Sequence, residues 1–186
     1  YGTDAYAMGD LLDAVDVASI AVPTRFHYDI AYDCIDAGVD VLVEKPFVED
    51  PADGRRLVEF ADERDVVLQV GHVERFNPAV RTLMDIVEDL DIIAVNAERL
   101  GPPPNREIED TAVMDLMIHD VDILLSLVDS DVRDVSAVGT RGTRYGTATV
   151  EFDSGVVGRL TASRVTQQKV RELTLTAADC RVIEVL

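Results

Sequence analysis

The hydrophobic and polar positions divide the chain into two parts with different rhythm. In the first part a segment of helical periodicity, residues 4–14, precedes three short apolar runs that alternate with further helical segments. The runs are residues 16–22, 39–43 and 66–70. Because strands separated by helices of this length form βαβ units, we expect three parallel strands. Their largely apolar character predicts a sheet that is covered on both faces.

The expected helices between these strands carry start and stop signals. Thr24 is placed to cap the first of them, and Gly38 is placed to end it. Asp50 is placed to cap the next helix, which would have Pro51 at its first position and run to about Arg64.

The second part predicts helices on one face of an open sheet. A helix near residues 78–90, a strand over 92–100 and a long helix over 112–128 are followed only by strands. These are expected near residues 132–139, 144–152, 156–163 and 170–177, with room for a fifth at the end. The run "FDSGV" between two of them is a hairpin signal. The fold class is therefore α/β: a partial Rossmann domain of parallel βαβ units over residues 1–75, then an α+β domain with a largely antiparallel open sheet over 76–186.

Charge changes the picture of the surface. The chain has 36 acidic and 17 basic residues, with Lys45 and Lys169 as its only lysines, and a formal net charge of −19. Hydrophobic residues make up 47% of it, so a core can form and disorder is not expected. An acidic, lysine-poor surface is typical of adaptation to molar salt; an ordinary acidic protein is the alternative. Nucleic acid is not an expected partner, because no basic face is present to bind phosphates.

Few features bear on location. The longest apolar runs fall well short of the roughly 20 residues that cross a bilayer, so no membrane partner is expected. No basic, apolar leader segment is evident. Cys34 and Cys180 are far apart and lack the spacing of a metal site, which fits a reducing compartment. The sequence therefore predicts a cytoplasmic protein.

Polar segments follow all three strands of the first part. They are residues 23–24, 44–46 and 71–72. The carboxyl ends of parallel strands share one edge of the sheet, where ligands bind in open α/β folds. Each segment alone is ordinarily structural: a helix entry, a solvated ion pair and a loop histidine. Their coincidence favours a ligand site, in which Pro46 restricts the backbone of Lys45 to extended conformations.

The long helix carries a second cluster. Asp115, His119, Asp122 and Ser126 recur at helical spacing. Asp115 and His119 are four residues apart and so are neighbours on one face, where a carboxylate can hold an imidazole in one tautomer and raise its basicity. This arrangement suits general acid–base catalysis. The alternative is that these residues are the solvent side of an amphipathic helix.

A metal centre is another use of the same residues. Its ligands would be His72, Glu74, Asp115 and His119. No cysteine and no tight ligand spacing supports such a centre, so no metal is predicted.

Three motifs in order resemble one family of enzymes. The segment "VASIAVPTRFHYDIAYDCIDAGVDVLVEKPF" is similar to the Gfo/Idh/MocA family of NAD(P)-dependent oxidoreductases, whose hallmark is Glu-Lys-Pro after a strand. "GHVERFNP" and "MDLMIHDVDIL" match its next two blocks at the right separation. The resemblance implies a Rossmann domain, an α/β domain whose open sheet mediates a homo-oligomer, and NAD or NADP as cofactor. It implies hydride transfer between a nicotinamide and a hydroxyl carbon of a sugar, cyclitol or nucleotide sugar.

The resemblance also implies residue roles. The cofactor-binding residues would be Pro23, Thr24, His27, Glu44, Lys45 and Pro46. Among these, Glu44 would hold the nicotinamide ribose. Lys45 would contact the reacting hydroxyl and stabilise the developing alkoxide, while His119, with Asp115, would be the general base.

The substrate is indicated less strongly. "GHVERFNPA" and "ERLGPPPNR" resemble the UDP-N-acetylglucosamine 3-dehydrogenase branch more than the inositol or glucose branches. A diphosphate substrate requires cations, for which Arg75, Arg99 and Arg106 are candidates, although each arginine can instead pair with the surplus acids. The substrate-contacting set expected here is His72, Arg75, Asn77 and Arg106.

The chain departs from the family pattern at its start. The Gly-rich turn that binds the pyrophosphate is absent, because "GTRGTRYG" lies between two late strands. We therefore expect a fragment that begins about two βα units into the Rossmann half and stops short of the full sheet. Two alternatives to a dehydrogenase stay open: a non-catalytic module that senses NAD(P) or sugar or serves assembly, and an isomerase or glycosidase that uses the nicotinamide transiently. The choice between NAD and NADP also stays open.

Overall fold

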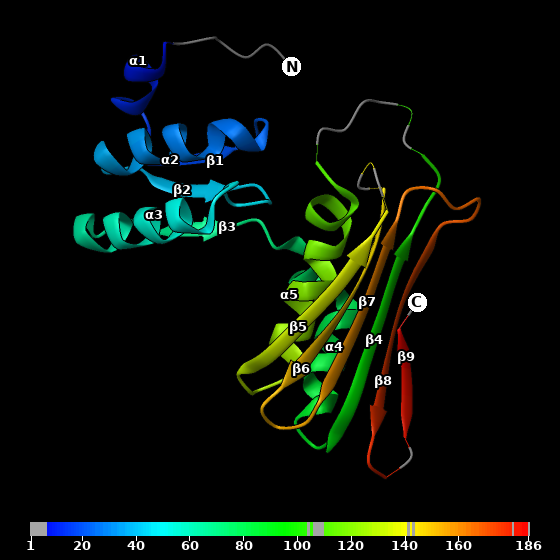
Figure 1. Cartoon of the computed structure of the whole chain (residues 1–186). Coiled ribbons are helices and arrows are strands. Elements are labelled where there is room, and N and C mark those ends of the chain that lie inside the picture. The colour runs from blue at the N-terminus through cyan, green and yellow to red at the C-terminus, as the bar shows by residue number, and fades with distance from the viewer. Residues whose placement is uncertain are drawn as a thin grey trace. The chain divides into compact units, whose positions relative to one another are not determined.

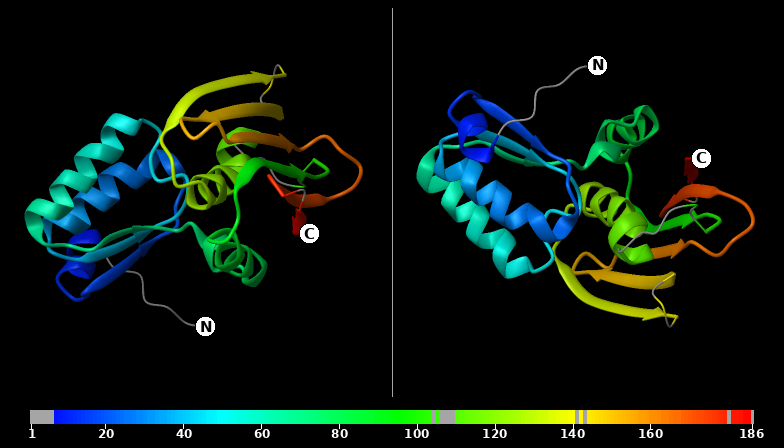
Figure 2. Two further views of the ribbon diagram at one scale, coloured as in Figure 1. Left: turned by 90° about the horizontal axis from the view of Figure 1, so that it is seen from below. Right: turned by 90° about the horizontal axis from the view of Figure 1, so that it is seen from above.

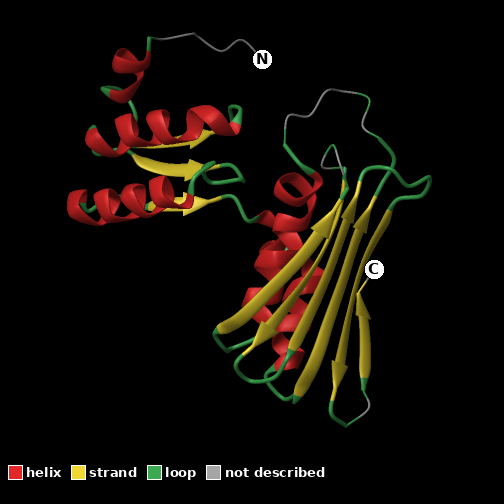
Figure 3. Cartoon of the chain, in the orientation of Figure 1, coloured by secondary structure: helices red, strands yellow, loops and turns green. Residues whose placement is uncertain are grey.

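The structure is a computed structural model of the 186-residue chain. It describes residues 7–103, 105, 110–140, 142, 144–179 and 181–185. The chain divides into two compact units, unit 1 (Tyr1–His72) and unit 2 (Val73–Leu186), and each is described by itself. Figure 3 distinguishes the three-stranded sheet of unit 1 from the six-stranded sheet of unit 2.

Unit 1 contains the three parallel strands that the sequence predicts. Its elements are α1 (Met8–Leu12), β1 (Val17–Ile20), the 3₁₀ turn η1 (Thr24–Phe26), α2 (His27–Asp36), β2 (Asp40–Val43), α3 (Pro51–Arg64) and β3 (Leu68–Val70). The strands pair in the order β1-β2-β3, and all pairs are parallel. Because successive right-handed crossovers advance across the sheet in one direction, α2 and α3 pack side by side on one face of it (Figure 2).

The core of unit 1 lies on that covered face. Ile20, Val41 and Val43 are buried there, whereas Val17 is 64% exposed and Leu42 is 39% exposed on the other face. The prediction of a sheet covered on both faces is therefore wrong for the described part of unit 1. Alternate residues of a strand point to opposite faces, and only one face carries the two helices.

Of the start and stop residues predicted for the helices of unit 1, Asp50 and Gly38 are confirmed and Thr24 is not. The Asp50 carboxylate accepts a hydrogen bond from the Ala52 amide at 2.8 Å, and Gly38, at φ +76°, follows the end of α2, both as predicted. The predicted cap at Thr24 is wrong, because Thr24 lies inside η1 and makes no capping bond. The amide of Phe26 instead donates to the carbonyl oxygen of Pro23, so the backbone itself closes this turn.

Unit 2 is a six-stranded sheet with helices on one face (Figure 1). Its elements are the 3₁₀ turn η2 (Val73–Phe76), α4 (Pro78–Val87), β4 (Ile92–Leu100), η3 (Val113–Met117), α5 (Ile118–Leu127), β5 (Val132–Gly139), β6 (Tyr145–Phe152), β7 (Val157–Ser163), β8 (Val170–Ala177) and β9 (Val182–Val185). The order is β5-β6-β7-β4-β8-β9. Among these described strands only the β4–β7 pair is parallel, so the largely antiparallel sheet is confirmed.

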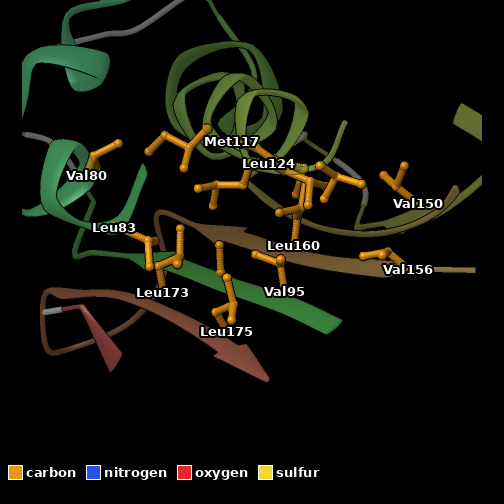
Figure 4. Packing of buried hydrophobic residues seen from close by; sticks show 14 of the residues in the cluster. Val80, Leu83, Val95, Met117, Leu124, Val150, Val156, Leu160, Leu173 and Leu175 are labelled. Carbon is orange, nitrogen blue, oxygen red and sulfur yellow. The ribbon is translucent and has the colours of Figure 1, made fainter. Parts of the chain in front are cut away.

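The core of unit 2 lies between the sheet and α4 and α5 (Figure 4). Leu124 from α5 packs over β7, where a Cβ on Gly158 would stand 2.4 Å from its Cδ2 atom. A side chain at position 158 would therefore clash with the side chain of Leu124, and glycine permits the close approach. Figure 4 shows Leu124 of α5 beside Leu160 of β7.

The predicted long helix over 112–128 is two pieces. η3 is a single turn of π-helix, in which the amide of Ile118 donates to the carbonyl of Val113, and α5 continues from it. Thr111 begins the segment, since its hydroxyl accepts a hydrogen bond from the Met114 amide at 3.1 Å. The residues on both sides of this turn are mostly apolar, so the sequence pattern does not reveal the extra residue of the π turn. Such turns occur frequently at functional sites.

No helix within the described residues has the length and apolar character needed to cross a membrane.

Candidate functional site

The polar segments that follow β1, β2 and β3 meet at one edge of the unit 1 sheet. Backbone pairing continues past the strands: the Glu44 amide donates to Ile20 at 2.9 Å, and the Gly71 amide donates to Val43 at 2.7 Å. A Cβ on Gly71 would stand 3.5 Å from Cα of Glu44, so the two loops are in van der Waals contact. The edge that the strand pattern predicts is thus present in the backbone.

Lys45 is half-buried at this edge. Its own amide lies 3.3 Å from a carboxylate oxygen of the exposed Glu44. The next residue, Pro46, is buried and follows a cis peptide bond. Lys45 therefore combines a cation with a backbone that its neighbours hold in place.

His27 supports this loop from within the unit. It is 1% exposed; its Nδ1 lies 2.8 Å from the carbonyl oxygen of Pro46, and its Nε2 lies 2.9 Å from that of Val22. Carbonyl oxygens only accept, so a ring nitrogen that carries a proton donates to the oxygen facing it, and the ring lies between the loop after β1 and the loop after β2. The contacts of His27 are with backbone atoms, so a role for it at the dinucleotide cleft stays a prediction.

These residues suit one end of a dinucleotide. An exposed carboxylate such as Glu44 accepts hydrogen bonds from ribose hydroxyls, and Lys45 supplies a cation beside it. Pro23 and Thr24, at the end of β1, are exposed and half-buried. The residues named here suit the nicotinamide ribose. They do not include a Gly-rich turn of the kind that binds the pyrophosphate.

The second cluster lies in unit 2 and begins with Asp115 in η3. Asp115 pairs with Arg164, whose Nη2 donates to its Oδ2 atom at 2.5 Å. Nη1 of the same guanidinium donates to the carbonyl oxygen of Asp110 at 2.7 Å. Nothing in the sequence analysis pointed to Arg164. Its only local signal is a cation directly after an apolar strand.

His119 follows in the first turn of α5, near Glu74. Burial alone would raise the pKa of the Glu74 carboxyl, but the Asn77 amide, the Arg99 guanidinium and the charge of His119 together lower it. Arg99 also donates to Asp120 at 2.7 Å and to Glu74 at 3.2 Å. Burial raises the pKa of Asp120 against the opposing effect of Arg99.

The alternative of a solvent-facing polar stripe is wrong for the acidic residues of α5. Asp120 and Asp122 are 6% and 8% exposed, and each pairs with an arginine. Arg75 binds Asp122 through Nε at 2.7 Å and Nη2 at 2.6 Å, the bidentate geometry of a strong ion pair. Asp120 and Asp122 therefore belong to a network of ion pairs, whereas Ser126 of the same helix is exposed.

The structure gives the predicted substrate residues other contacts as well. Arg99 and Arg75 pair with acidic residues, which is the alternative that the sequence analysis gave to binding a diphosphate. Asn77 caps α4 through its oxygen, which accepts from the Ala79 amide at 3.0 Å. His72 is half-buried at the end of unit 1. Arg106 lies outside the described residues.

No cluster of three or more metal-ligating side chains is found in the part of the chain that the structure describes.

Comparisons with known proteins identify the family. A family described as "Oxidoreductase family, NAD-binding Rossmann fold" matches residues 3–72, and the "GFO/IDH/MocA C-terminal domain" matches residues 92–181. The chain belongs to the Gfo/Idh/MocA oxidoreductase family. The predicted family, its NAD-binding Rossmann fold and the fold class are thereby confirmed.

Individual Gfo/Idh/MocA relatives cover the chain widely. UDP-N-acetylglucosamine 3-dehydrogenase of Acidithiobacillus ferrooxidans is 37% identical over 169 residues, which are 89% of this chain and 54% of that protein. An inositol 2-dehydrogenase of Corynebacterium glutamicum is 30% identical over 128 residues, or 66% of this chain and 38% of that protein. A solved structure of the Acidithiobacillus enzyme, GnnA, matches with a TM-score of 0.90 and 36% identity over 96% of this chain and 58% of that one. The chain spans about half the length of the curated relatives it matches.

Proposed function

We propose that the protein carrying this chain is an NAD(P)-dependent dehydrogenase that acts on a hydroxyl carbon of a sugar or nucleotide sugar. The observation that carries the proposal is Lys45. One of only two lysines in the chain stands at the ligand edge of a parallel sheet, beside a carboxylate and in a loop that His27 ties in place. The similarity to a UDP-N-acetylglucosamine 3-dehydrogenase supports that substrate class.

The proposed roles follow from the chemistry of each side chain. When bound, the nicotinamide supplies the hydride acceptor for oxidation. Glu44 accepts hydrogen bonds from the ribose hydroxyls. Lys45 donates to the substrate oxygen and stabilises the negative charge that develops on it. His119 removes the hydroxyl proton, and Asp115 orients its ring.

Recognition of the substrate is proposed for His72, Arg75, Asn77 and Arg106. Arg75 illustrates the support: its side chain is 50% exposed, and its two bonds to Asp122 use two of the five guanidinium donors. A cation held in one orientation by a buried carboxylate suits a diphosphate. UDP-N-acetylglucosamine is the substrate that we would test first.

Three further properties are proposed for the intact protein. The charge of −19 supports function in molar salt, and the unpatterned cysteines support a cytoplasmic location. The open sheet supports a homo-oligomer. Its edge strand β5 is exposed along its whole length and presents Val132, Val135 and Val138 to solvent. Light scattering of a variant with aspartate at Val135 and Val138 would test the interface, with dissociation expected.

The decisive experiment follows absorbance at 340 nm. The intact protein is supplied in molar KCl with NAD or NADP and with UDP-sugars, free sugars or inositols. We expect the absorbance at 340 nm to increase with a UDP-sugar. Lys45→Ala should reduce turnover by about 10³-fold or more, because the charge on the reacting oxygen loses its cation.

Lys169→Ala is the matched control, since Lys169 is the other lysine and is exposed between β7 and β8. Its turnover should equal that of the parent. Near-normal turnover of Lys45→Ala would refute the assignment of Lys45. Cofactor binding without turnover of any substrate would instead favour the sensing module.

A further inference from the structure

Arg164 is a buried cation that the proposed roles do not yet use. It follows β7 and is 7% exposed. Its guanidinium contacts two points of the segment that leads to His119: the carbonyl oxygen of Asp110 and the carboxylate of Asp115. Its own amide donates to the carbonyl oxygen of Arg144 at 2.8 Å, which joins its backbone to the residue directly before β6. A rigid strand end therefore holds η3, which packs against β7.

The burial of this cation is costly and calls for a specific use. The chain has 36 acidic residues, so an exposed arginine would find counter-charges without leaving water. Desolvation of a guanidinium is offset only by good geometry with its acceptors. At Asp115 that acceptor is a carboxylate with 24% side-chain exposure, four residues before His119.

The groups around His119 show a pattern of matched charges. The charge of His119 helps to lower the pKa of Glu74 in η2, and Asp115 in η3 precedes His119 by four residues. Each of these carboxylates is paired with an arginine that is 7% exposed, Arg164 and Arg99 respectively. Beyond them, Asp120 binds Arg99 and Arg171 lies 3.7 Å from Glu74. The negative charges near the imidazole are therefore balanced in a chain that is strongly acidic overall.

We propose that Arg164 is a positioning residue of the candidate active site: it orients the carboxylate of Asp115 and offsets its charge, so that His119 stays neutral and available as a base. This inference rests on the proposed dehydrogenase function. Two carboxylates without arginine partners would favour the imidazolium, which cannot accept a proton.

Two variants separate charge from geometry. Arg164→Met removes the charge and keeps an unbranched apolar stem, whereas Arg164→Lys keeps the charge and loses the two-pronged donor. For Arg164→Met we expect a fall in kcat of about 10-fold to 100-fold with KM within about threefold. The acid limb of the pH profile of kcat/KM should shift to higher pH by about one pH unit. For Arg164→Lys the limb should return to its original position while kcat recovers only in part.

A matched control is Arg181→Met. Arg181 pairs with Asp179 at 2.5 Å, the same distance as Arg164 and Asp115, but both partners are exposed between β8 and β9. Kinetics and pH profile should match the parent. An unchanged acid limb and kcat within about twofold in Arg164→Met would overturn the proposal.

A second measurement does not depend on turnover. The 186-residue chain has three histidines, so nuclear magnetic resonance can follow the titration of His119, assigned by loss of its signal in His119→Asn. Arg164→Met should raise the titration midpoint of His119 by about one pH unit, and Arg164→Met/Asp115→Asn should return it toward the parent value. An unmoved midpoint in Arg164→Met would refute the proposal.

The two measurements distinguish the possible failures. If the parent turns over no substrate, the proposed function fails and the titration alone decides the role of Arg164. If circular dichroism shows that Arg164→Met does not fold, Arg164→Lys and the double variant supply the comparison. An unaltered kcat in Arg164→Lys, or an unaltered midpoint in the double variant relative to Asp115→Asn, would then refute the role of the charge pair.

Discussion

The two units hold their candidate functional residues in different ways. In unit 1 the ring of His27 contacts backbone carbonyl oxygens in two loops and so steadies the segment with Lys45. In unit 2 the guanidinium groups of Arg99 and Arg164 contact carboxylates around the helix with His119. One unit uses dipoles of the main chain, and the other uses buried ion pairs.

The difference teaches how an acidic chain can build two kinds of site. The acceptors in unit 1 are backbone carbonyl oxygens, which carry no net charge and keep their acceptor strength whatever the salt. A buried ion pair depends on both partners staying charged, and removal of one leaves the other uncompensated. Arginine supplies this anchor in unit 2, where its fork binds two acceptors at once.

Replacement of Arg99 by methionine should break the anchor of unit 2 and have the largest effect on stability. Asp120 and Glu74 would lose the guanidinium that contacts both. The free energy of unfolding should fall by about 3 kcal/mol, as is typical when one partner of a buried pair is removed. Urea unfolding followed by circular dichroism measures this.

Arg133→Met is the control for that variant. Arg133 pairs with Glu151, and both side chains are about half exposed. Its urea midpoint should stay close to that of the parent. Equal effects of the two substitutions would mean that ion pairs do not anchor unit 2.

Replacement of His27 by alanine should break the anchor of unit 1 by a somewhat smaller amount. The carbonyl oxygens of Val22 and Pro46 would lose their donor, at a cost of about 2 kcal/mol. Hydrogen exchange should quicken at the amides of Glu44, Lys45 and Phe47 and stay unchanged in unit 2. Glutamine at position 27 keeps an amide donor and should lie between the parent and alanine. Exchange that quickens equally in both units would contradict a local anchor.

Much of this fold could be predicted because its elements are local in sequence. The strand β4 begins and ends where the apolar pattern predicts, at Ile92 and Leu100, and Asp50 caps α3 as its position before a proline indicates. These outcomes depend on periodicity and on contacts within a few residues. The exposed face of the unit 1 sheet could not be predicted, because cover is decided by which elements pack on it.

The site was harder to predict because its contacts join distant parts of the chain. Arg164 and Asp115 are 49 positions apart, and Arg75 and Asp122 are 47 apart. His27 was assigned to a ligand by the resemblance, whereas its partners are backbone atoms that no motif identifies. The π turn at η3 lies among mostly apolar residues, so only the hydrogen bonds reveal its extra residue.

The N-caps of α3 and α4 allow the two units to be compared through a smaller loss of unfolding free energy, about 1 kcal/mol for a cap. Asp50 and Asn77 each accept from the amide two residues on, at 2.8 and 3.0 Å, and each precedes a proline. Alanine at Asp50 should cost about 1 kcal/mol, the usual value of a cap. Alanine at Asn77 should cost more, because the Asn77 amide also donates to Glu74 at 3.2 Å.

Exchange of the two cap residues sharpens this test. Asp50→Asn should change the urea midpoint little, because both residues cap well. Asn77→Asp keeps the cap but places a second carboxylate beside Glu74, so it should destabilise unit 2. Equal behaviour of the two exchanges would show that the charge network does not extend to the start of α4.

The smallest expected effect is the acid dependence of stability due to Glu74. Its pKa is lowered in the folded chain, because the donors Asn77 and Arg99 and the charge of His119 together outweigh the effect of burial. Folding thus favours the ionised form, so the contribution of Glu74 is complete above the ordinary carboxyl pKa and is lost as pH falls through the lower folded value. Asp120, whose pKa is raised by burial, acts in the opposite sense. Glu74→Gln removes the first contribution and only reduces the second, because the charge of Glu74 is a lesser cause of the raised pKa of Asp120. This variant should therefore lose less stability than the parent between about pH 5 and pH 3. Urea midpoints across that range measure the slope, and a slope as steep as that of the parent would mean that Glu74 is not held ionised by its partners.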